Sequence, residues 1–230
     1  MKDIDNNTNA SINQAVIRFP GIDLKTRDAH KLRGYFGDIF KEYSTLLHNH
    51  YSDGSSRYKY PLVQYKVIDK LPVLTGFGEG ADLLIKLFLD INRLNINGQT
   101  YEISSKNISN IIVKFDDFSQ LHTYEFKTLW MALNQDNYSK YMALKTIEEK
   151  NKFLNKILTG NILSFYKGID VFINEKILIK GKYFERQTHF KNKKMLAFKG
   201  EFITNAIIPD FTGVGKSTSR GFGTIFAKKV

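Results

Sequence analysis

The chain has 230 residues, enough for one large or two smaller domains, and 42% of them are hydrophobic, which supports packed cores. It has no cysteine, which excludes disulfides, a thiolate nucleophile and cysteine-based zinc sites. Its 34 Lys and Arg against 23 Asp and Glu give a formal net charge of +11, which favours a polyanionic partner, and 18 Phe and 12 Tyr favour nucleic acid because exposed rings stack on bases. No apolar run reaches the ~20 residues of a membrane span, and the polar N-terminus does not fit a signal peptide, so we expect no membrane partner and a cytoplasmic protein.

The first half of the chain alternates strand and helix patterns after an expected disordered tail at residues 1–12. In chain order the patterns predict a strand at 14–19, a helix at 28–47, strands at 60–68 and 71–77, a helix at 78–91 and a strand at 97–104. The order β-α-β-β-α-β is that of the ferredoxin-like unit, a four-stranded antiparallel sheet with two helices on one face. We therefore expect a first domain at residues 13–105.

The second half, residues 106–230, is less regular. Its patterns predict strands at 108–115 and 122–133, a long helix at 137–158, a hairpin of 176–190 with 194–208 around the basic turn "KNKK", and a last strand at 224–230. This order fits a degenerate second ferredoxin-like unit whose second helix is weak or missing. The expected fold class is α+β, with two tandem ferredoxin-like (RRM-like) domains and a C-terminal glycine-rich loop.

The stretch "GVGKSTSRGFG" (213–223) resembles the end of a nucleotide-binding P-loop, but the spacing is wrong. The motif requires a glycine five residues before Gly215, where Asp210 stands, and a helix after the loop, where Gly221 and Gly223 interrupt the chain. A P-loop NTPase therefore remains only a distant alternative. Glycines that bracket a basic, hydroxyl-rich run instead indicate a loop whose backbone can approach a ligand closely, or a flexible hairpin turn. The expected phosphate-binding residues are Gly213, Gly215, Lys216, Ser217, Thr218, Ser219, Arg220, Gly221 and Gly223.

His48 and His50 stand where the first predicted helix ends, and Arg57 and Lys59 follow closely. Near neutral pH a histidine can act as general base or acid, and RNA carries its own nucleophile, the 2′-hydroxyl beside each phosphate. A histidine and a cation therefore suffice for RNA cleavage without a metal ion. The alternative is a pair of surface or helix-capping histidines. The remaining histidines fit structural or exposed positions, and the sequence shows no pattern of metal ligands.

The glycine-rich stretch, "LLHNHYSDGSSRYKYPLVQYKVI" (46–68) and "GFGEGADLLIK" (76–86) together resemble a known family. They are similar to the RAMP superfamily and, within it, to the CRISPR-associated endoribonucleases that cut repeat RNA into guide units, the Cas-six family. At the level of layout the resemblance covers most of residues 14–230. It is most specific at the glycine loop and at 46–68.

The resemblance implies cleavage of precursor CRISPR RNA by the 2′-hydroxyl, without metal or cofactor, leaving a 2′,3′-cyclic phosphate and a 5′-hydroxyl. It implies His48 or His50 as general acid or base, with Lys59 or Arg57 stabilising charge. Further candidates for RNA binding are Lys66, Lys191, Lys193 and Lys194. The expected partners are CRISPR repeat RNA and other CRISPR effector subunits, with the protein a monomer or homodimer. The alternatives are a non-catalytic RAMP-type RNA-binding subunit and a sequence-nonspecific RNA-binding protein.

Overall fold

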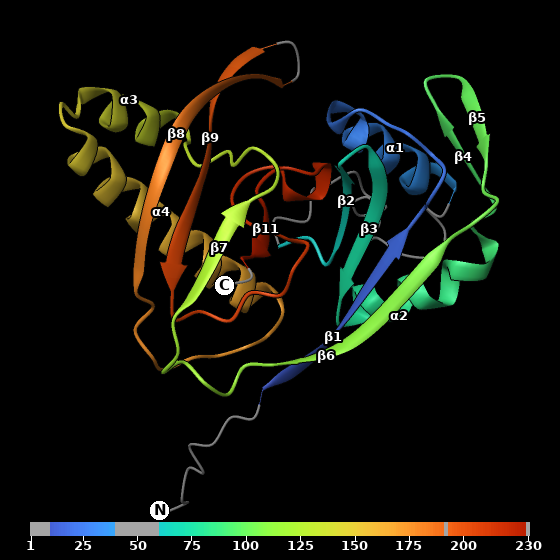
Figure 1. Ribbon diagram of the computed structural model, residues 1–230, viewed down its shortest axis with the longest axis horizontal. Helices are drawn as coiled ribbons and strands as arrows, with labels where there is room; N and C mark the ends of the chain where they lie inside the picture. Colours follow the sequence, from blue (N-terminus) through green and yellow to red (C-terminus); the bar gives the residue numbers. More distant parts are fainter. Residues whose placement is uncertain (1–9, 40–59, 191–192, 229–230) are drawn as a thin grey trace, which may run out of the picture.

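The computed structural model describes residues 10–39, 60–190 and 193–228. These residues form a four-stranded sheet and a five-stranded sheet, each with helices on it, and a separate two-stranded hairpin (Figure 1). The expected α+β class with two ferredoxin-like units is confirmed. In the part of the chain that the structure describes, no helix has both the length and the apolar character that a membrane span requires.

The first unit has the strand order of a ferredoxin-like sheet. Its strands, in spatial order, are β2 (Val63–Ile68), β3 (Leu71–Phe77), β1 (Ser11–Arg18) and β6 (Asn107–Lys114). All neighbours are antiparallel. The helices α1 (Ala29–Ile39) and α2 (Glu79–Leu87) pack against this sheet, and short 3-10 helices lie at Thr26–Asp28 and Phe88–Asp90. β1 begins at Ser11, so residues 11 and 12 belong to a strand and not to the tail expected at 1–12. Part of the helix expected at 28–47 lies outside the described residues.

The fourth strand of the first sheet is β6 and not the strand expected at 97–104. The stretch 97–104 contributes β5 (Gln99–Glu102), which pairs with β4 (Arg93–Ile96) around an Asn-Gly turn and stays outside the main sheet. The strand expected at 108–115 in the second unit is β6, and it pairs with β1 along its whole length. A boundary near residue 106 would separate these two strands. We therefore propose a division in the connection between β6 and β7.

The second unit repeats the ferredoxin-like order with one helix missing. Its strands, in spatial order, are β10 (Thr212–Gly213), β11 (Thr224–Ala227), β7 (His122–Phe126), β9 (Lys193–Thr204) and β8 (Ile179–Phe190). Without the short β10, this is the order 4-1-3-2 of a ferredoxin-like sheet. The connection from β9 to β11 contains only a 3-10 helix (Thr218–Arg220) where the second helix would be. The expected hairpin around "KNKK" is confirmed, whereas β7 is shorter than the strand expected at 122–133.

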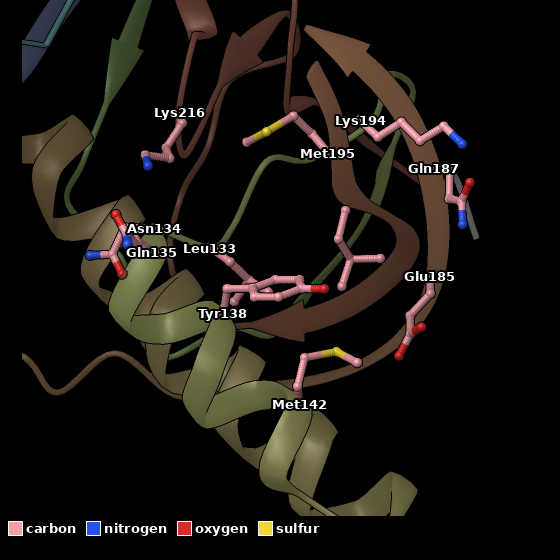
Figure 2. Close-up of a pocket in the computed structure, with 11 residues that line it drawn as sticks. Leu133, Asn134, Gln135, Tyr138, Met142, Glu185, Gln187, Lys194, Met195 and Lys216 are labelled. Atoms are coloured by element: carbon pink, nitrogen blue, oxygen red, sulfur yellow. The ribbon is translucent and has the colours of Figure 1, made fainter.

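Two helices replace the single helix expected at 137–158. They are α3 (Gln135–Ala143) and α4 (Ile147–Gly168), and α3 lies beside the β8–β9 hairpin (Figure 2). Thr146 starts α4 with a capping box, in which its hydroxyl accepts from the backbone of Glu149 while the Glu149 carboxylate accepts from the backbone of Thr146. This Thr-x-x-Glu pattern is a helix start, and it explains why the long helical pattern is broken there.

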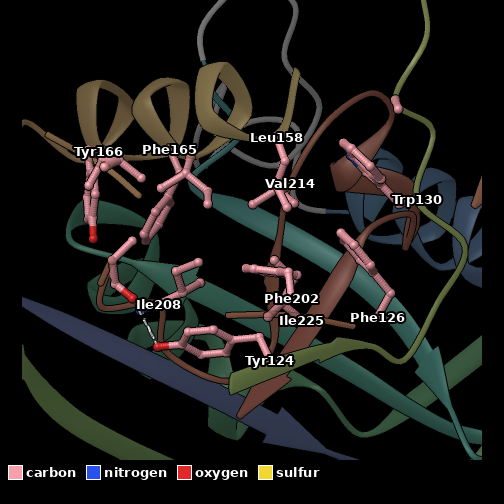
Figure 3. Close-up of a cluster of buried hydrophobic side chains, with 14 of the residues drawn as sticks. Tyr124, Phe126, Trp130, Leu158, Phe165, Tyr166, Phe202, Ile208, Val214 and Ile225 are labelled. Carbon is pink, nitrogen blue, oxygen red and sulfur yellow. Dashed lines mark hydrogen bonds between the residues drawn. The ribbon is translucent and has the colours of Figure 1, made fainter. Parts of the chain in front are cut away.

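The core of the second unit lies between its sheet and α4 and is rich in aromatic rings (Figure 3). Leu158 and Phe165 of α4 and Phe202 of β9 are at most 1% exposed. The Tyr124 hydroxyl accepts a hydrogen bond of 2.9 Å from the backbone of Ile208, so that this buried polar group is satisfied. Burial raises the pKa of Tyr124 to about 12.

Aromatic packing also joins the two units. The Phe165 ring of α4 lies 5.3 Å from the ring of Tyr60 and 5.4 Å from that of Phe77, both of which belong to the first unit. Phe77 is fully buried and belongs to the same cluster of apolar side chains as the core of the second unit. The two sheets therefore share apolar contacts at the face where the glycine-rich segment also lies.

Candidate functional site

The glycine-rich segment 213–223 lies between the two units, against β2 (Figure 1). The Gly213 backbone donates a hydrogen bond of 2.9 Å to the Gln64 side chain, and the Tyr60 hydroxyl donates one of 2.6 Å to the Gly213 carbonyl. The Gln64 amide also donates to the Tyr60 hydroxyl. The side chains of Tyr60, just before β2, and of Gln64, in β2, thus bind the backbone at the beginning of the segment.

Packing requires the glycines of this segment. A Cβ at Gly213 would lie 2.7 Å from the Gln64 Oε1 atom, and one at Gly215 would lie 2.6 Å from the Trp130 indole nitrogen. Gly215 also has φ +89°, which favours glycine. The backbone of Lys216 donates to the Met131 carbonyl, so the segment is tied to the second unit as well. The segment therefore packs closely against both units.

This packing limits which residues of the segment can meet a ligand. Gly213, Thr218, Gly221 and Gly223 are buried, and a direct contact between RNA and these four would need the packing to open. Lys216 is exposed, and the other three side chains of the run, Ser217, Ser219 and Arg220, are partly exposed. Gly215 is also partly exposed, so the expected phosphate-binding surface is reduced to Gly215 and these four residues.

A P-loop is excluded by the same geometry. Only the three-residue 3-10 helix follows Lys216 before β11 begins, so no helix N-terminus is available to complete a phosphate site. Asp210 serves the scaffold instead. Its carbonyl accepts a hydrogen bond of 2.6 Å from the Gln14 side chain, and its carboxylate accepts one of 2.7 Å from the backbone of Ala227.

Lys66 is wrong as an RNA contact in this structure, because its side chain is completely buried. β2 has α1 on one face and the glycine-rich segment on the other, so neither face of the strand reaches solvent at Lys66. The Lys66 ammonium donates a hydrogen bond of 2.8 Å to the Gln64 side chain. Burial lowers the pKa of Lys66 to about 7, so the lysine is close to losing its charge at neutral pH.

A cavity of about 600 Å³ opens beside the glycine-rich segment, and we call it the junction cavity. Both units line it, with Thr26, Arg27, His30, Lys31, Thr128, Leu129, Thr188, His189, Arg220, Gly221 and Phe222. His30 stands at the start of α1 and His189 near the end of β8, and both side chains are exposed. Three cationic side chains and two histidines around one cavity make a site that attracts anions.

The acidic group nearest in sequence to these cations is already paired. Asp28 is 6% exposed and forms an ion pair of 2.8 Å with Lys31. Burial alone would raise the pKa of Asp28, but hydrogen bonds from the Lys31 side chain and the Lys25 backbone outweigh burial and lower it. Burial lowers the pKa of the Arg33 guanidinium, and the nearby charge of Arg220 lowers it further. Arg33 and Arg220 therefore lie close enough for their like charges to interact, and Arg220 lines the cavity.

His30 has a defined proton in this arrangement. Its Nδ1 atom lies 2.7 Å from the Arg27 carbonyl, which can only accept, so the proton of the neutral ring is on Nδ1. The Nε2 atom of that ring is then an acceptor. Among the described residues, no three His, Asp or Glu side chains gather in a way that could hold a metal ion.

The structure brings together only some of the residues that the sequence indicated. His48, His50, Arg57, Lys59 and Lys191 lie outside the described residues. Lys193 and Lys194 are exposed at the base of the hairpin turn, and their contact with RNA stays a prediction. Sequence reasoning missed His30, His189, Arg27 and Lys31 as partners of Arg220. The basic residues around the start of the first helix were a signal for an anion site. Their proximity to β8 is a tertiary contact, which the sequence does not show.

The fold has the two tandem ferredoxin-like units and the glycine-rich segment that the resemblance to the RAMP superfamily implies. Family models extend this from the fold to the sequence: the Cas6b N-terminal domain matches residues 10–114 and the Cas6b C-terminal domain matches residues 118–228. The chain belongs to the Cas6b family.

Solved structures agree with this assignment. The chain is 35% identical to a protein described as Cas6b, with 95% of this chain and 100% of that chain covered and a TM-score of 0.89. It is 33% identical, with the same coverage and a TM-score of 0.76, to a protein described as the CRISPR RNA processing endoribonuclease Cas6b. An uncharacterized protein of Methanocaldococcus jannaschii is 35% identical over 146 residues, which are 61% of this chain and 95% of that protein.

Proposed function

We propose that this chain is a metal-independent endoribonuclease that binds CRISPR repeat RNA and cuts precursor CRISPR RNA into guide units. The observation that carries the proposal is the 33% identity, over 95% of the chain, to a structure described as a CRISPR RNA processing endoribonuclease. The cations of the junction cavity support it, because they offer the sugar-phosphate backbone a positively charged site made by both units.

The proposed reaction uses the RNA's own nucleophile. The 2′-oxygen forms a bond to the adjacent phosphorus while the bond from phosphorus to the departing 5′-oxygen breaks. A base takes the proton of the 2′-hydroxyl, and an acid gives a proton to the 5′-oxygen, so that the products carry a 2′,3′-cyclic phosphate and a 5′-hydroxyl. We assign base or acid to His48 or His50 and charge stabilisation to Lys59 or Arg57.

Metal removal gives the direct test of this reaction. End-labelled repeat RNA from the host locus, incubated with the protein in EDTA, is expected to give one discrete cut, at a rate equal to that in Mg²⁺. The upstream product is expected to resist 3′-end ligation until its cyclic phosphate is opened and the resulting phosphate is removed, which frees the 3′-hydroxyl. Cleavage that stops in EDTA would contradict the proposed chemistry. Tight binding without any cut would make the chain a non-catalytic RAMP subunit.

RNA affinity is expected to depend on Arg220 through charge rather than through sequence. The change Arg220→Gln removes one cation of the junction cavity, so it is expected to weaken binding equally for repeat and unrelated RNA. The slope of log affinity against log salt concentration is expected to flatten by about 0.7 for each lost phosphate contact with single-stranded RNA. Filter binding over a series of salt concentrations measures both quantities.

The matched control is Lys86→Gln, which removes the same charge from an exposed position of α2 that lines neither cavity described here. The control is expected to keep the affinity and the slope of the wild type. Equal slopes for Arg220→Gln, Lys86→Gln and the wild type would show that RNA does not reach the junction cavity.

A further inference from the structure

A second cavity, also of about 600 Å³, lies within the second unit, between α3 and the β8–β9 hairpin (Figure 2). We call it the hairpin pocket. Its lining is Leu133, Asn134, Gln135, Tyr138, Met142, Glu185, Gln187, Lys194, Met195, Leu196 and Lys216. It shares no residue with the junction cavity, and its size is within the range of small-ligand sites.

The wall that α3 contributes is apolar and exposed. Tyr138 and Met142 are four residues apart and therefore lie on one face of the helix, where they are 45% and 53% exposed. Figure 2 shows both side chains directed toward the hairpin. The helix uses another residue for folding, because Tyr141 is 2% exposed and packs in the core. The Tyr138 ring is thus available as a flat surface that the core does not use.

The remaining lining combines apolar side chains, those of Leu133, Met195 and Leu196, with polar and positively charged ones. The amide side chains of Gln135 and Gln187 offer donors and acceptors to the pocket. Glu185 is the one acid of the lining, and it is held by the Tyr141 hydroxyl at 2.8 Å and by the Lys150 ammonium at 3.0 Å.

Two lysines complete the pocket. Lys216 comes from the glycine-rich segment and Lys194 from the hairpin, and they lie at opposite sides of the pocket, both across from the Tyr138 ring (Figure 2). In the part of the chain that the structure describes, neither lysine makes an ion pair. Both are therefore open to an anionic group of a ligand.

We propose that the hairpin pocket binds one unpaired nucleotide of the RNA, with its base stacked on Tyr138 and its flanking phosphates at Lys194 and Lys216. Exposed rings, amides for base edges and cations for phosphates are the three features by which proteins hold single-stranded RNA. The net charge of +11 favours RNA over an apolar peptide as the occupant. The inference rests on the proposed function, and it assigns the place on the protein where one base of the RNA is bound.

The test couples a change in the protein to a change in the RNA. Each unpaired position of the repeat is replaced in turn by an abasic site, and the affinities are measured for the wild type and for Tyr138→Ala. Tyr138→Ala is expected to bind intact repeat roughly 5- to 100-fold more weakly. One abasic position is expected to weaken the wild type by a similar factor and to have no effect on the variant. Additive losses at every position would overturn the inference.

Two further variants separate stacking from general damage. Tyr138→Phe keeps the ring and is expected to keep the wild-type affinity. Phe172→Ala removes an aromatic ring that is 77% exposed and lines neither cavity, and it is expected to bind like the wild type. A loss of RNA affinity in Phe172→Ala as large as that in Tyr138→Ala would show that the effect does not come from the hairpin pocket.

A crosslinking measurement on the wild-type protein guards against a misfolded variant. Repeat RNAs that each carry one 5-iodouridine are irradiated in the complex, and one of them is expected to crosslink to the peptide that contains Tyr138. No such crosslink from any position, in a protein that binds and cuts the repeat, would overturn the inference alone. Failure to prefer repeat over unrelated RNA would overturn the proposed function, and the inference with it.

Discussion

Replacing one of the two histidines, as His48→Ala or His50→Ala, is expected to lower the cleavage rate of repeat RNA by roughly 10²- to 10⁴-fold, the usual contribution of general acid–base catalysis. The loss is expected in the rate of single-turnover cleavage, with affinity for the RNA unchanged, because the histidine acts on protons of the reacting phosphate. The measurement is single-turnover cleavage of end-labelled RNA with protein in excess, together with filter binding.

The comparison variant for the histidines is His122→Ala. His122 lies in β7 and lines neither cavity, so this variant is expected to cut at the rate of the wild type. Wild-type cleavage by both single histidine variants and by the double variant would remove these residues from the mechanism. His30 and His189 of the junction cavity would then be the next histidines to replace.

The change Lys66→Met is expected to stabilise the protein at neutral pH and much less at alkaline pH. The pKa of Lys66 is about 7 in the folded protein against an ordinary value of 10.5, so the unfolded chain binds more protons between these values. The free energy of unfolding of the wild type therefore rises with pH across that window. The full difference corresponds to roughly 5 kcal/mol, and the lost hydrogen bond to Gln64 offsets part of it.

Urea unfolding of wild type and Lys66→Met at pH 7 and at pH 10 measures this effect. The expected advantage of the variant is about 2 to 5 kcal/mol at pH 7, and it shrinks as pH rises toward 10.5. Lys199→Met, at an exposed position of β9, is the matched control and is expected to have no pH-dependent advantage. An advantage of Lys66→Met that is the same at both pH values would show that burial does not perturb this lysine.

Local patterns were sufficient for most of the fold. The Asp69-Lys70 turn between β2 and β3, with both residues at positive φ, and the hairpin around residues 191–194 follow from strand patterns that flank short polar turns. The place of β6 does not follow from local pattern. Either β5 or β6 could supply the fourth strand in chain order, and the choice is made by pairing with β1, nearly a hundred residues earlier in the chain.

The candidate site was less accessible to sequence reasoning, for two physical reasons. Lys66 was expected to bind RNA, yet β2 is covered on both faces at the junction of the units. His30 and His189 share a cavity although they belong to different units, and no spacing in the sequence encodes that meeting. The glycine pattern identified a segment that packs between the two units, and packing against Gln64 and Trp130 explains the glycines at 213 and 215.

Cleavage of repeat RNA with a single 2′-deoxy sugar at the cut position tests the central claim most directly. The reaction is run in EDTA, beside the all-ribose RNA, with affinity measured for both. We expect the deoxy RNA to bind as tightly as the ribose RNA and to remain uncut, because the nucleophile is missing. Cleavage of the deoxy RNA at the same phosphate would mean that a different nucleophile attacks, and it would contradict the account.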